Sequence, residues 1–366
     1  MTRLVAFLLA LGAVISSGSL ANSYGSYTEH GIPSEARYSM GVRARGVWDI
    51  AYQDGSLYIG SGDFDSNAGP VDVWKYDIGN ESWAKSGTLA EEEINKFVRI
   101  GDNLCTPGIE PREGSCTYYT LKGAKWQTNG SLPVANHVFD IAEYEGKIFV
   151  GLDVRAGEYP LAVSKDKGKS FENVKMRKDS KPLDTSKGSV VRVYDLFELK
   201  GSLYALFRYR EGDTKLFDLY KYENGEFVFV SPWYDKLEVK KYVSGFIGAD
   251  AVYADRLWFT TGNLYTTADM ENVEKVNDDE KTEFRDLCVD KDLLLALGCE
   301  NNQDGTYTIS IWKNESGNPE DFVKIKYFKY TAPAVSFLAT EDKIYIGTGD
   351  ISGVNPKSGM LLSIDK

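Results

Sequence analysis

The sequence has little of what most metal sites and hydrolytic triads require. It contains only two histidines, His30 and His137, and its four cysteines include no closely spaced C-x-x-C pair. A His-rich metal site and a standard cysteine zinc site are therefore excluded. The G-x-S-x-G, H-E-x-x-H and Walker signatures are also missing, so no common hydrolase or nucleotide-binding motif is present.

Basic clusters are lacking as well. The formal net charge is −12, and the Lys and Arg residues do not gather into a patch. Nucleic acid and anionic membranes are therefore poor partners, and we interpret the acidity as a source of solubility. Beyond the N-terminus no segment approaches the roughly 20 apolar residues that a membrane helix needs, so we expect no membrane span.

The one long apolar run lies at the N-terminus. Arg3 precedes an apolar segment over 4–15, and Ser19-Leu20-Ala21 supplies small residues before a cleavage point. This pattern predicts a signal peptide over 1–21 and secretion to an extracellular or periplasmic space, with an uncleaved anchor as the alternative. Residues 22–36 would then form an N-terminal extension, and residues 37–366 a single domain.

The composition favours strands and turns over helices. The chain has 23 Tyr, 17 Phe and 7 Trp, together with 35 Gly. Aromatic residues favour strands and glycine favours tight turns. No segment carries a sustained helical apolar stripe, so the sequence predicts an all-β fold.

One phrase recurs seven times: an apolar strand, a tight polar turn, and a second apolar strand that ends in small residues. The clearest copies are 48–60, 139–151 and 194–206, and the weaker ones are 97–105, 249–259, 286–297 and 335–347. Successive copies lie 37 to 55 residues apart, which matches the size of a propeller blade. The sequence predicts a seven-bladed β-propeller of four-stranded antiparallel blades, with six or eight blades as the alternatives.

The last copy is too short to complete a blade. After the strand at 344–347, only residues 359–365 remain for a third strand. We expect an N-terminal strand over 37–42 to supply the missing outer strand and to close the ring without an exposed edge. An open seventh blade is the alternative.

One turn carries a recognisable motif. Ser164, Asp166, Gly168, Ser170 and Phe171 match the pattern S-x-D-x-G-x-[ST]-[WF] at every defining position. The segment resembles the Asp-box, or bacterial neuraminidase repeat, and the chain is similar in this respect to sialidase-like β-propellers. The resemblance implies a structural turn, in which Asp accepts amide hydrogen bonds and the aromatic residue packs between sheets. The Arg-Ile-Pro motif of sialidases is absent and no Tyr-Glu pair is assignable, so the resemblance provides no catalytic residue.

The cysteines and the sequons suggest modifications of an exported protein. An even number of cysteines allows disulfides. We expect bonds within the pairs Cys105–Cys116 and Cys288–Cys299, with free thiols as the alternative. Asn80, Asn129 and Asn314 each begin an N-x-S sequon at an expected turn or loop, so each is a possible glycosylation site.

Candidate functional residues gather where inner strands open onto the propeller axis. The residues expected to bind ligand at this axial mouth are Asp49, His137, Asp140, Arg192, Asp195, Arg208 and Asp286. A ring of carboxylates could hold calcium, although no motif requires a cofactor. The recurrence of the Asp in four repeats favours a framework role, bonded to backbone amides or to a neighbouring blade. His137 interrupts the repeat and is the stronger functional candidate, with an ordinary hydrogen-bonded role as the alternative.

The sequence therefore favours a secreted, monomeric propeller that binds a glycan or an extracellular protein at the axial mouth. A sialidase-like glycoside hydrolase or lyase with a non-standard active site is the alternative. A third reading is an interaction protein that binds its partner through exposed aromatic residues on one face.

Overall fold

The computed structural model describes residues 23–33, 43–63, 65, 69–111, 116–130, 132–133, 135–154, 158–179, 181–182, 191–211, 214–233, 236–237, 248–276 and 279–366. Within these ranges the chain consists of strands and two short 3₁₀ helices, Arg43–Arg45 and Pro319–Asp321. The expected all-β class is confirmed. No helix in these ranges is long and apolar enough to cross a membrane. The predicted signal peptide, residues 1–21, lies outside the described residues.

Five sheets each contain four antiparallel strands, and the fourth of these sheets also carries a short parallel edge strand. The first holds β3 (Asp49–Gln53), β4 (Ser56–Gly60), β5 (Val71–Asp77) and β6 (Ser82–Leu89). The second holds β7 (Val98–Ile100), β8 (Asn103–Pro107), β9 (Tyr118–Lys122) and β10 (Lys125–Thr128). The third holds β21 (Asp250–Tyr253), β22 (Arg256–Thr260), β23 (Leu264–Thr267) and β24 (Glu274–Lys275). The fourth holds β25 (Glu283–Asp290), β26 (Leu293–Asn301), β27 (Tyr307–Asn314) and β28 (Val323–Tyr330), and the fifth holds β29 (Ala334–Ala339), β30 (Lys343–Thr348), β31 (Leu361–Asp365) and β2 (Thr28–Glu29).

The sixth sheet has ten strands, and it overturns the predicted count of seven separate four-stranded blades. Its strands are β11 (His137–Tyr144), β12 (Lys147–Val154), β13 (Leu161–Ser164), β14 (Glu172–Asn173), β15 (Met176–Lys178), β16 (Lys181–Pro182), β17 (Val191–Leu199), β18 (Ser202–Glu211), β19 (Thr214–Glu223) and β20 (Glu226–Pro232). The pairing of β12 with β13 stops at Gly151, and the end of β12 pairs instead with β17, Asp153 opposite Arg192. Buried backbone groups need hydrogen-bond partners, and those at the end of β12 find them on β17. This pairing joins the two neighbouring repeats into one sheet.

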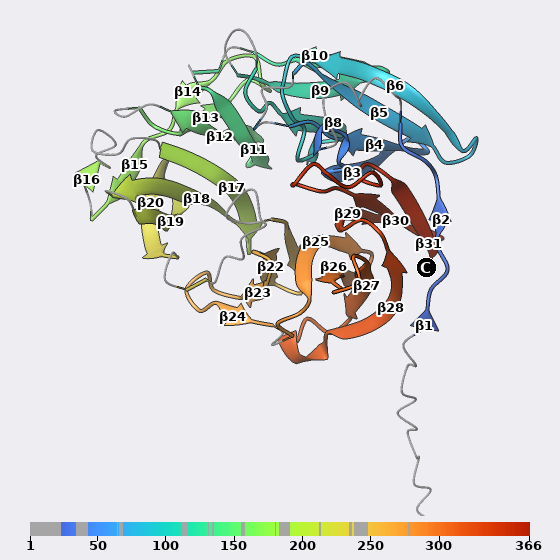
Figure 1. Cartoon of the computed structure of the whole chain (residues 1–366). Coiled ribbons are helices and arrows are strands. Elements are labelled where there is room, and N and C mark those ends of the chain that lie inside the picture. The colour runs from blue at the N-terminus through green and yellow to red at the C-terminus, as the bar shows by residue number, and fades with distance from the viewer. Residues whose placement is uncertain are drawn as a thin grey trace, which may run out of the picture.

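The sheets surround a shared centre, with β11, β17, β25 and β29 on the inner side (Figure 1). This radial arrangement is that of a β-propeller. An N-terminal strand does join the last sheet, since β2 pairs antiparallel with β31. The strand expected at 37–42 lies outside the described residues, and the residues that pair with β31 are Thr28 and Glu29. A second short strand, β1 (Ser23–Tyr24), runs parallel to β28.

The core lies mainly between neighbouring sheets. Trp233, which follows β20 and is fully buried, stacks on Phe259 of β22 with ring centroids 5.4 Å apart. Phe171 meets Tyr118 of the second sheet edge-on at 6.0 Å. Such aromatic pairs contribute about 0.5–1.5 kcal/mol beyond their buried area, so each sheet is stabilised by the flank of the next.

Glycine at the inner end of a second strand lets the next inner strand approach closely. A Cβ on Gly60 would lie 2.6 Å from the carbonyl oxygen of Ile94, and a Cβ on Gly151 would lie 2.8 Å from that of Val193. Neither distance is compatible with ordinary packing. The small residue at these positions is therefore required by close approach of the next repeat's backbone, at the segment before β7 for Gly60 and at β17 for Gly151.

The turn that follows β13 is organised around Asp166. Its Oδ1 accepts hydrogen bonds from the amides of Lys169 and Ser170, at 3.1 and 2.9 Å, and its Oδ2 accepts one from the Ser170 hydroxyl at 2.6 Å. These donors hold the pKa of Asp166 below its ordinary value. Ser164 Oγ accepts from the amide of Gly168, whose φ of +82° favours glycine.

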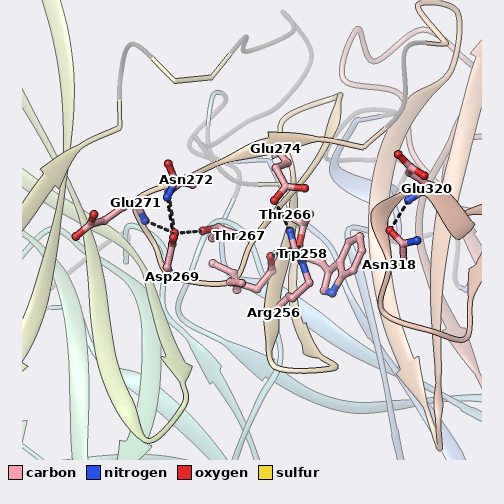
Figure 2. Close-up of polar contacts among 12 residues, drawn as sticks. Arg256, Trp258, Thr266, Thr267, Asp269, Glu271, Asn272, Glu274, Asn318 and Glu320 are labelled. Atoms are coloured by element: carbon pink, nitrogen blue, oxygen red, sulfur yellow. Dashed lines mark hydrogen bonds and ion pairs between the residues drawn. The ribbon is translucent and has the colours of Figure 1, made fainter.

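A second turn of similar construction joins β23 to β24 (Figure 2). Asp269 accepts hydrogen bonds from the amides of Glu271 and Asn272 at 2.9 and 2.8 Å, and from the Asn272 side chain at 2.8 Å. These bonds lower the pKa of Asp269 to about 2. This turn could not be recognised from the sequence, because it lacks the glycine and the aromatic residue that define the motif at 164–171.

The predicted disulfides are wrong: all four cysteines are free. Cys288 lies opposite Leu295 and Cys105 lies opposite Thr120, so each expected partner, Cys299 or Cys116, sits four positions from the facing residue. Four strand positions correspond to about 13 Å, whereas a disulfide needs Cα atoms within about 7 Å. Alignment of the repeats already places Cys288 and Cys299 at positions that are not directly opposed, and the structure shows the same for Cys105 and Cys116.

The three sequon asparagines differ in exposure. Asn80 lies exposed in the β5–β6 turn and Asn129 is partly buried. Asn314 is fully buried at the end of β27, where its Nδ2 donates to the carbonyl of Asn318 at 2.6 Å. Asn80 is therefore the asparagine that the fold presents most openly.

We expect Gly60→Ala to lower the free energy of unfolding by about 1–3 kcal/mol, because the added methyl group forces β4 away from the backbone that leads into β7. Gly79→Ala is the control, since a Cβ there meets nothing closer than 3.6 Å. Urea unfolding of both variants measures the effect. Equal midpoints for the two variants would contradict the close-approach argument.

Candidate functional site

Four inner strands carry a β-bulge at the same repeat position. The extra residues are Phe139 in β11, Tyr194 in β17, Arg285 in β25 and Val335 in β29. A bulge re-aims the side chain of the extra residue, and bulges are frequent beside functional sites. All four extra residues line one cavity at the inner ends of these strands.

The cavity has a volume of about 360 Å³, within the range of small-molecule sites. Its aromatic lining residues are Trp48, Phe97, Phe139, Tyr194 and Phe284. Its charged lining residues are Arg43, Asp49, Glu93, Lys96, Arg192, Asp195, Asp250, Arg285 and Asp286, and His137 also contributes. The arrangement combines flat apolar surfaces with charged groups of both signs.

The repeated aspartate links adjacent inner strands. One carboxylate oxygen accepts from the next amide of its own strand, and the other accepts from the amide at the equivalent position of the following repeat. The sets are Asp49 with Ile50 and Phe97, Asp140 with Ile141 and Leu196, and Asp286 with Leu287 and Phe337. We name this double contact the carboxylate staple. Burial nevertheless raises the pKa of Asp49 to about 7, against the opposing effect of its two amide donors.

Lys96 occupies the aspartate position in the second repeat, directly before Phe97. Its Nζ lies 2.9 Å from Asp140 Oδ2 and 3.4 Å from Asp250 Oδ1. Burial acts to lower the pKa of Lys96, but Asp140, Asp250 and Asp195 more than offset this and raise it. Lys96 is therefore the internal counter-ion of a ring of carboxylates.

Asp195 is the repeat member without a staple. The amide of Leu196, which would complete its own-strand contact, donates to Asp140 instead. Asp195 is 7% exposed, and among the described residues its buried Oδ2 has no hydrogen-bond partner. Burial raises its pKa well above the usual value, and the neighbouring Asp250 and Asp140 add to the rise.

His137 is held between two carboxylates at the mouth. Its Nδ1 lies 2.9 Å from Asp153 and its Nε2 lies 2.9 Å from Glu110. Asp153 also pairs with Arg192 Nε at 3.0 Å, and Arg192 Nη1 donates to the Tyr194 hydroxyl at 3.2 Å. Both imidazole nitrogens are engaged, so in this conformation neither is available to act as a base on a ligand.

Acidic partners also accompany the other arginines that line the cavity. Arg43 pairs with Asp63 at 3.4 Å and with Asp65, and Arg285 pairs with Glu283. These pairs fix the guanidinium groups and offset their charge.

Five of the seven residues expected at the mouth line the cavity: Asp49, His137, Arg192, Asp195 and Asp286. Asp140 is buried behind Lys96, and Arg208 lies over the Tyr194 ring at 5.1 Å from its centroid. Sequence reasoning missed Lys96 and Asp250, although Lys96 directly precedes the copy at 97–105 and Asp250 lies at the start of the copy at 249–259, so alignment of those weaker copies would have identified both. In the described part of the chain, no three His, Cys, Asp or Glu side chains are placed to hold a metal ion, so calcium stays a prediction.

Two glutamates beside the cavity are buried in the segment between β6 and β7. Glu91 and Glu92 are 0% and 1% exposed, and Glu91 accepts a hydrogen bond from the Tyr119 hydroxyl at 2.9 Å. In the described structure, the second oxygen of each carboxyl group has no partner. Burial raises the pKa of both residues to about 7.

We expect Asp286→Ala to lower the free energy of unfolding by about 1–3 kcal/mol for each amide left unpaired. Asp195→Ala provides the matched control, because that carboxyl group accepts no amide hydrogen bond. Chemical denaturation at pH 7 compares the two. A loss in Asp195→Ala as large as that in Asp286→Ala would show that the staple is not what stabilises the ring.

The buried glutamates predict a pH dependence. Their pKa is raised from about 4.5 to about 7 by folding, so the folded state binds more protons in this window and stability falls as pH rises through it. We expect Glu91→Gln to be more stable than the parent chain at pH 8 and to lose that advantage at pH 5. Thermal unfolding across this range tests the prediction, with the exposed Glu223→Gln as control. An unchanged difference between parent and Glu91→Gln at the two pH values would refute it.

No family model matches the chain, and no curated protein matches it. Solved structures share its architecture at low sequence identity. A structure of the mitotic checkpoint complex is 11% identical, with a TM-score of 0.54 over 100% of this chain and 99% of that chain. The S511A mutant of puromycin hydrolase complexed with PGG is 10% identical, with a TM-score of 0.51 over 89% of this chain and 53% of that chain.

Polysaccharide lyase Uly1 is also 10% identical, with a TM-score of 0.50 over 88% of this chain and 90% of that chain. Likeness at this level of identity concerns the fold alone. Together with the radial sheets, it supports a β-propeller.

Proposed function

We propose that this chain is a secreted binding protein whose axial cavity recognises a polar group of a glycan or of an extracellular protein. The observation that carries the proposal is the cavity itself, where bulged residues from four inner strands meet charged side chains. Its volume of about 360 Å³ suits one sugar unit or one large side chain better than an extended polymer.

The chemistry of the lining supports recognition of an amphipathic group. The rings of Trp48, Phe139 and Tyr194 offer flat apolar surface, and the charged residues around them can orient hydroxyl or amide groups. Sugar rings and polar side chains both combine an apolar face with a polar edge.

Preorganisation also supports binding. The lining side chains stand on paired strands, and the carboxylate staples tie those strands together. A site that is ordered before the ligand arrives loses less side-chain entropy on binding.

The proposal also includes secretion of the chain and its relation to the Asp-box propellers. The sequence pattern of residues 1–21 supports secretion. The hydrogen bonds that Asp166 accepts support kinship with the Asp-box propellers, whose motif this turn resembles.

Glycan-array and peptide-array binding by the purified chain tests the function, followed by affinity measurement on any hit. We expect Tyr194→Ala to weaken binding about tenfold, equivalent to about 1.4 kcal/mol. Tyr52→Ala is the matched control, since Tyr52 is 45% exposed on another surface.

Equal affinity of the two tyrosine variants would place binding outside the cavity and refute the proposal. Turnover of a glycan that is lost in cavity variants would instead establish a hydrolase or lyase, the alternative suggested by the sequence.

A further inference from the structure

Acidic residues outnumber basic ones around the axial cavity. Its lining holds four basic residues, Arg43, Lys96, Arg192 and Arg285, against five acidic ones, Asp49, Glu93, Asp195, Asp250 and Asp286. Three arginines in one cavity suggest an anion site, but each already has an acidic partner. Those partners, Asp63, Asp65, Asp153 and Glu283, add four more carboxylates behind the lining.

Asp195 is the acidic residue whose bonding is incomplete. Its repeat equivalents Asp49, Asp140 and Asp286 each accept two backbone amides. Asp195 accepts none within the described structure, although it is 7% exposed and lines the cavity. A buried carboxyl oxygen without a hydrogen-bond partner lowers the stability of the folded chain. A ligand that donates a hydrogen bond to this oxygen removes that cost, which strengthens its binding.

Lys96 shows which chemistry this ring of carboxylates accepts. Its ammonium group contacts Asp140 at 2.9 Å and Asp250 at 3.4 Å. Among the described residues, Asp250 forms one ion pair, the one with Lys96. Asp195 lies close enough to Lys96 and Asp250 to interact electrostatically with both, yet among the described residues it forms no ion pair of its own.

We propose that the cavity selects ligands that carry a primary ammonium group, and that this group binds between Asp195 and Asp250. The inference rests on the proposed binding function and specifies its ligand class. An ammonium group donates three hydrogen bonds, which suits two carboxylates on neighbouring inner strands. A metal ion is disfavoured, because no three acidic, His or Cys side chains of the described residues are arranged to coordinate one.

The ammonium group could belong to an amino sugar or to a lysine side chain, and four probes separate these sources. Glucosamine is compared with N-acetylglucosamine, and Nα-acetyl-lysine amide with its Nε-acetylated form. Isothermal titration of the full chain at low ionic strength measures each affinity. We expect at least one amine to bind, and its acetylated form to bind at least tenfold more weakly.

Two variants localise the effect. Asp195→Asn keeps the shape and removes the charge, and it should weaken amine binding at least tenfold; Asp250→Asn should do the same and serves if the first variant does not fold. Asp54→Asn is the control. It removes one charge from an exposed turn at the far end of the β3–β4 hairpin, and it should change affinity less than twofold.

The outcomes separate this inference from the proposed function. Binding of neutral or acetylated probes that depends on Tyr194 but not on Asp195 would overturn ammonium selection and leave the binding function intact. Absence of binding by all four probes and by both arrays would overturn both. Amine binding that Asp195→Asn and Asp54→Asn weaken equally would reduce the effect to net charge and reject the site.

Discussion

A carboxylate that accepts amides from two adjacent inner strands is the constraint on which the centre of this propeller depends. An amide N–H satisfies one acceptor, so the amide of Leu196 that donates to Asp140 is lost to Asp195. The staples therefore join inner strands in pairs, through Asp49 to Phe97, Asp140 to Leu196 and Asp286 to Phe337. Among the junctions without a staple, the one between the last and the first inner strand uses Ser336, whose hydroxyl donates to the Val47 carbonyl at 2.6 Å.

Because the strands are joined in pairs, Asp195 receives no backbone amide within the described structure, and this residue lines the cavity. Asp195 lies on β17, which is already stapled to β11 through Asp140. The next inner strand, β21, carries its own aspartate, Asp250, which contacts Lys96. The framework role favoured by the recurrence of the aspartate thus describes three members of the repeat. Asp195 and Asp250 carry the same side chain without the same bonds, so their carboxylates are the ones that remain available to a ligand. At this one repeat position, some aspartates therefore have a structural role and others are available for a functional one.

Much of the architecture could be predicted, because each inner hairpin depends on a short strand–turn–strand pattern that is visible in the sequence. The apolar phrase identified the inner hairpins, and most of the residues expected at the mouth line the cavity. Long-range pairing could not be predicted: nothing near Asp153 indicates that it faces Arg192, and that contact merges two repeats into a ten-stranded sheet. The cysteine pairs failed for a related reason, since strand register decides which residues face each other. Lys96 was missed because its opposite charge hides its equivalence to the aspartates.

The β-bulge explains how neighbouring residues come to share one site. Along a regular strand successive side chains point to opposite faces, so Tyr194 and Asp195 would diverge. The extra residue in β17 breaks this alternation, and both side chains line the cavity; Arg285 and Asp286 behave alike in β25. An aromatic or basic group is thereby set beside a carboxyl group at several points of the ring. The chemical character of the mouth follows from this backbone irregularity, which lets one repeated position be varied without disturbing the staple next to it.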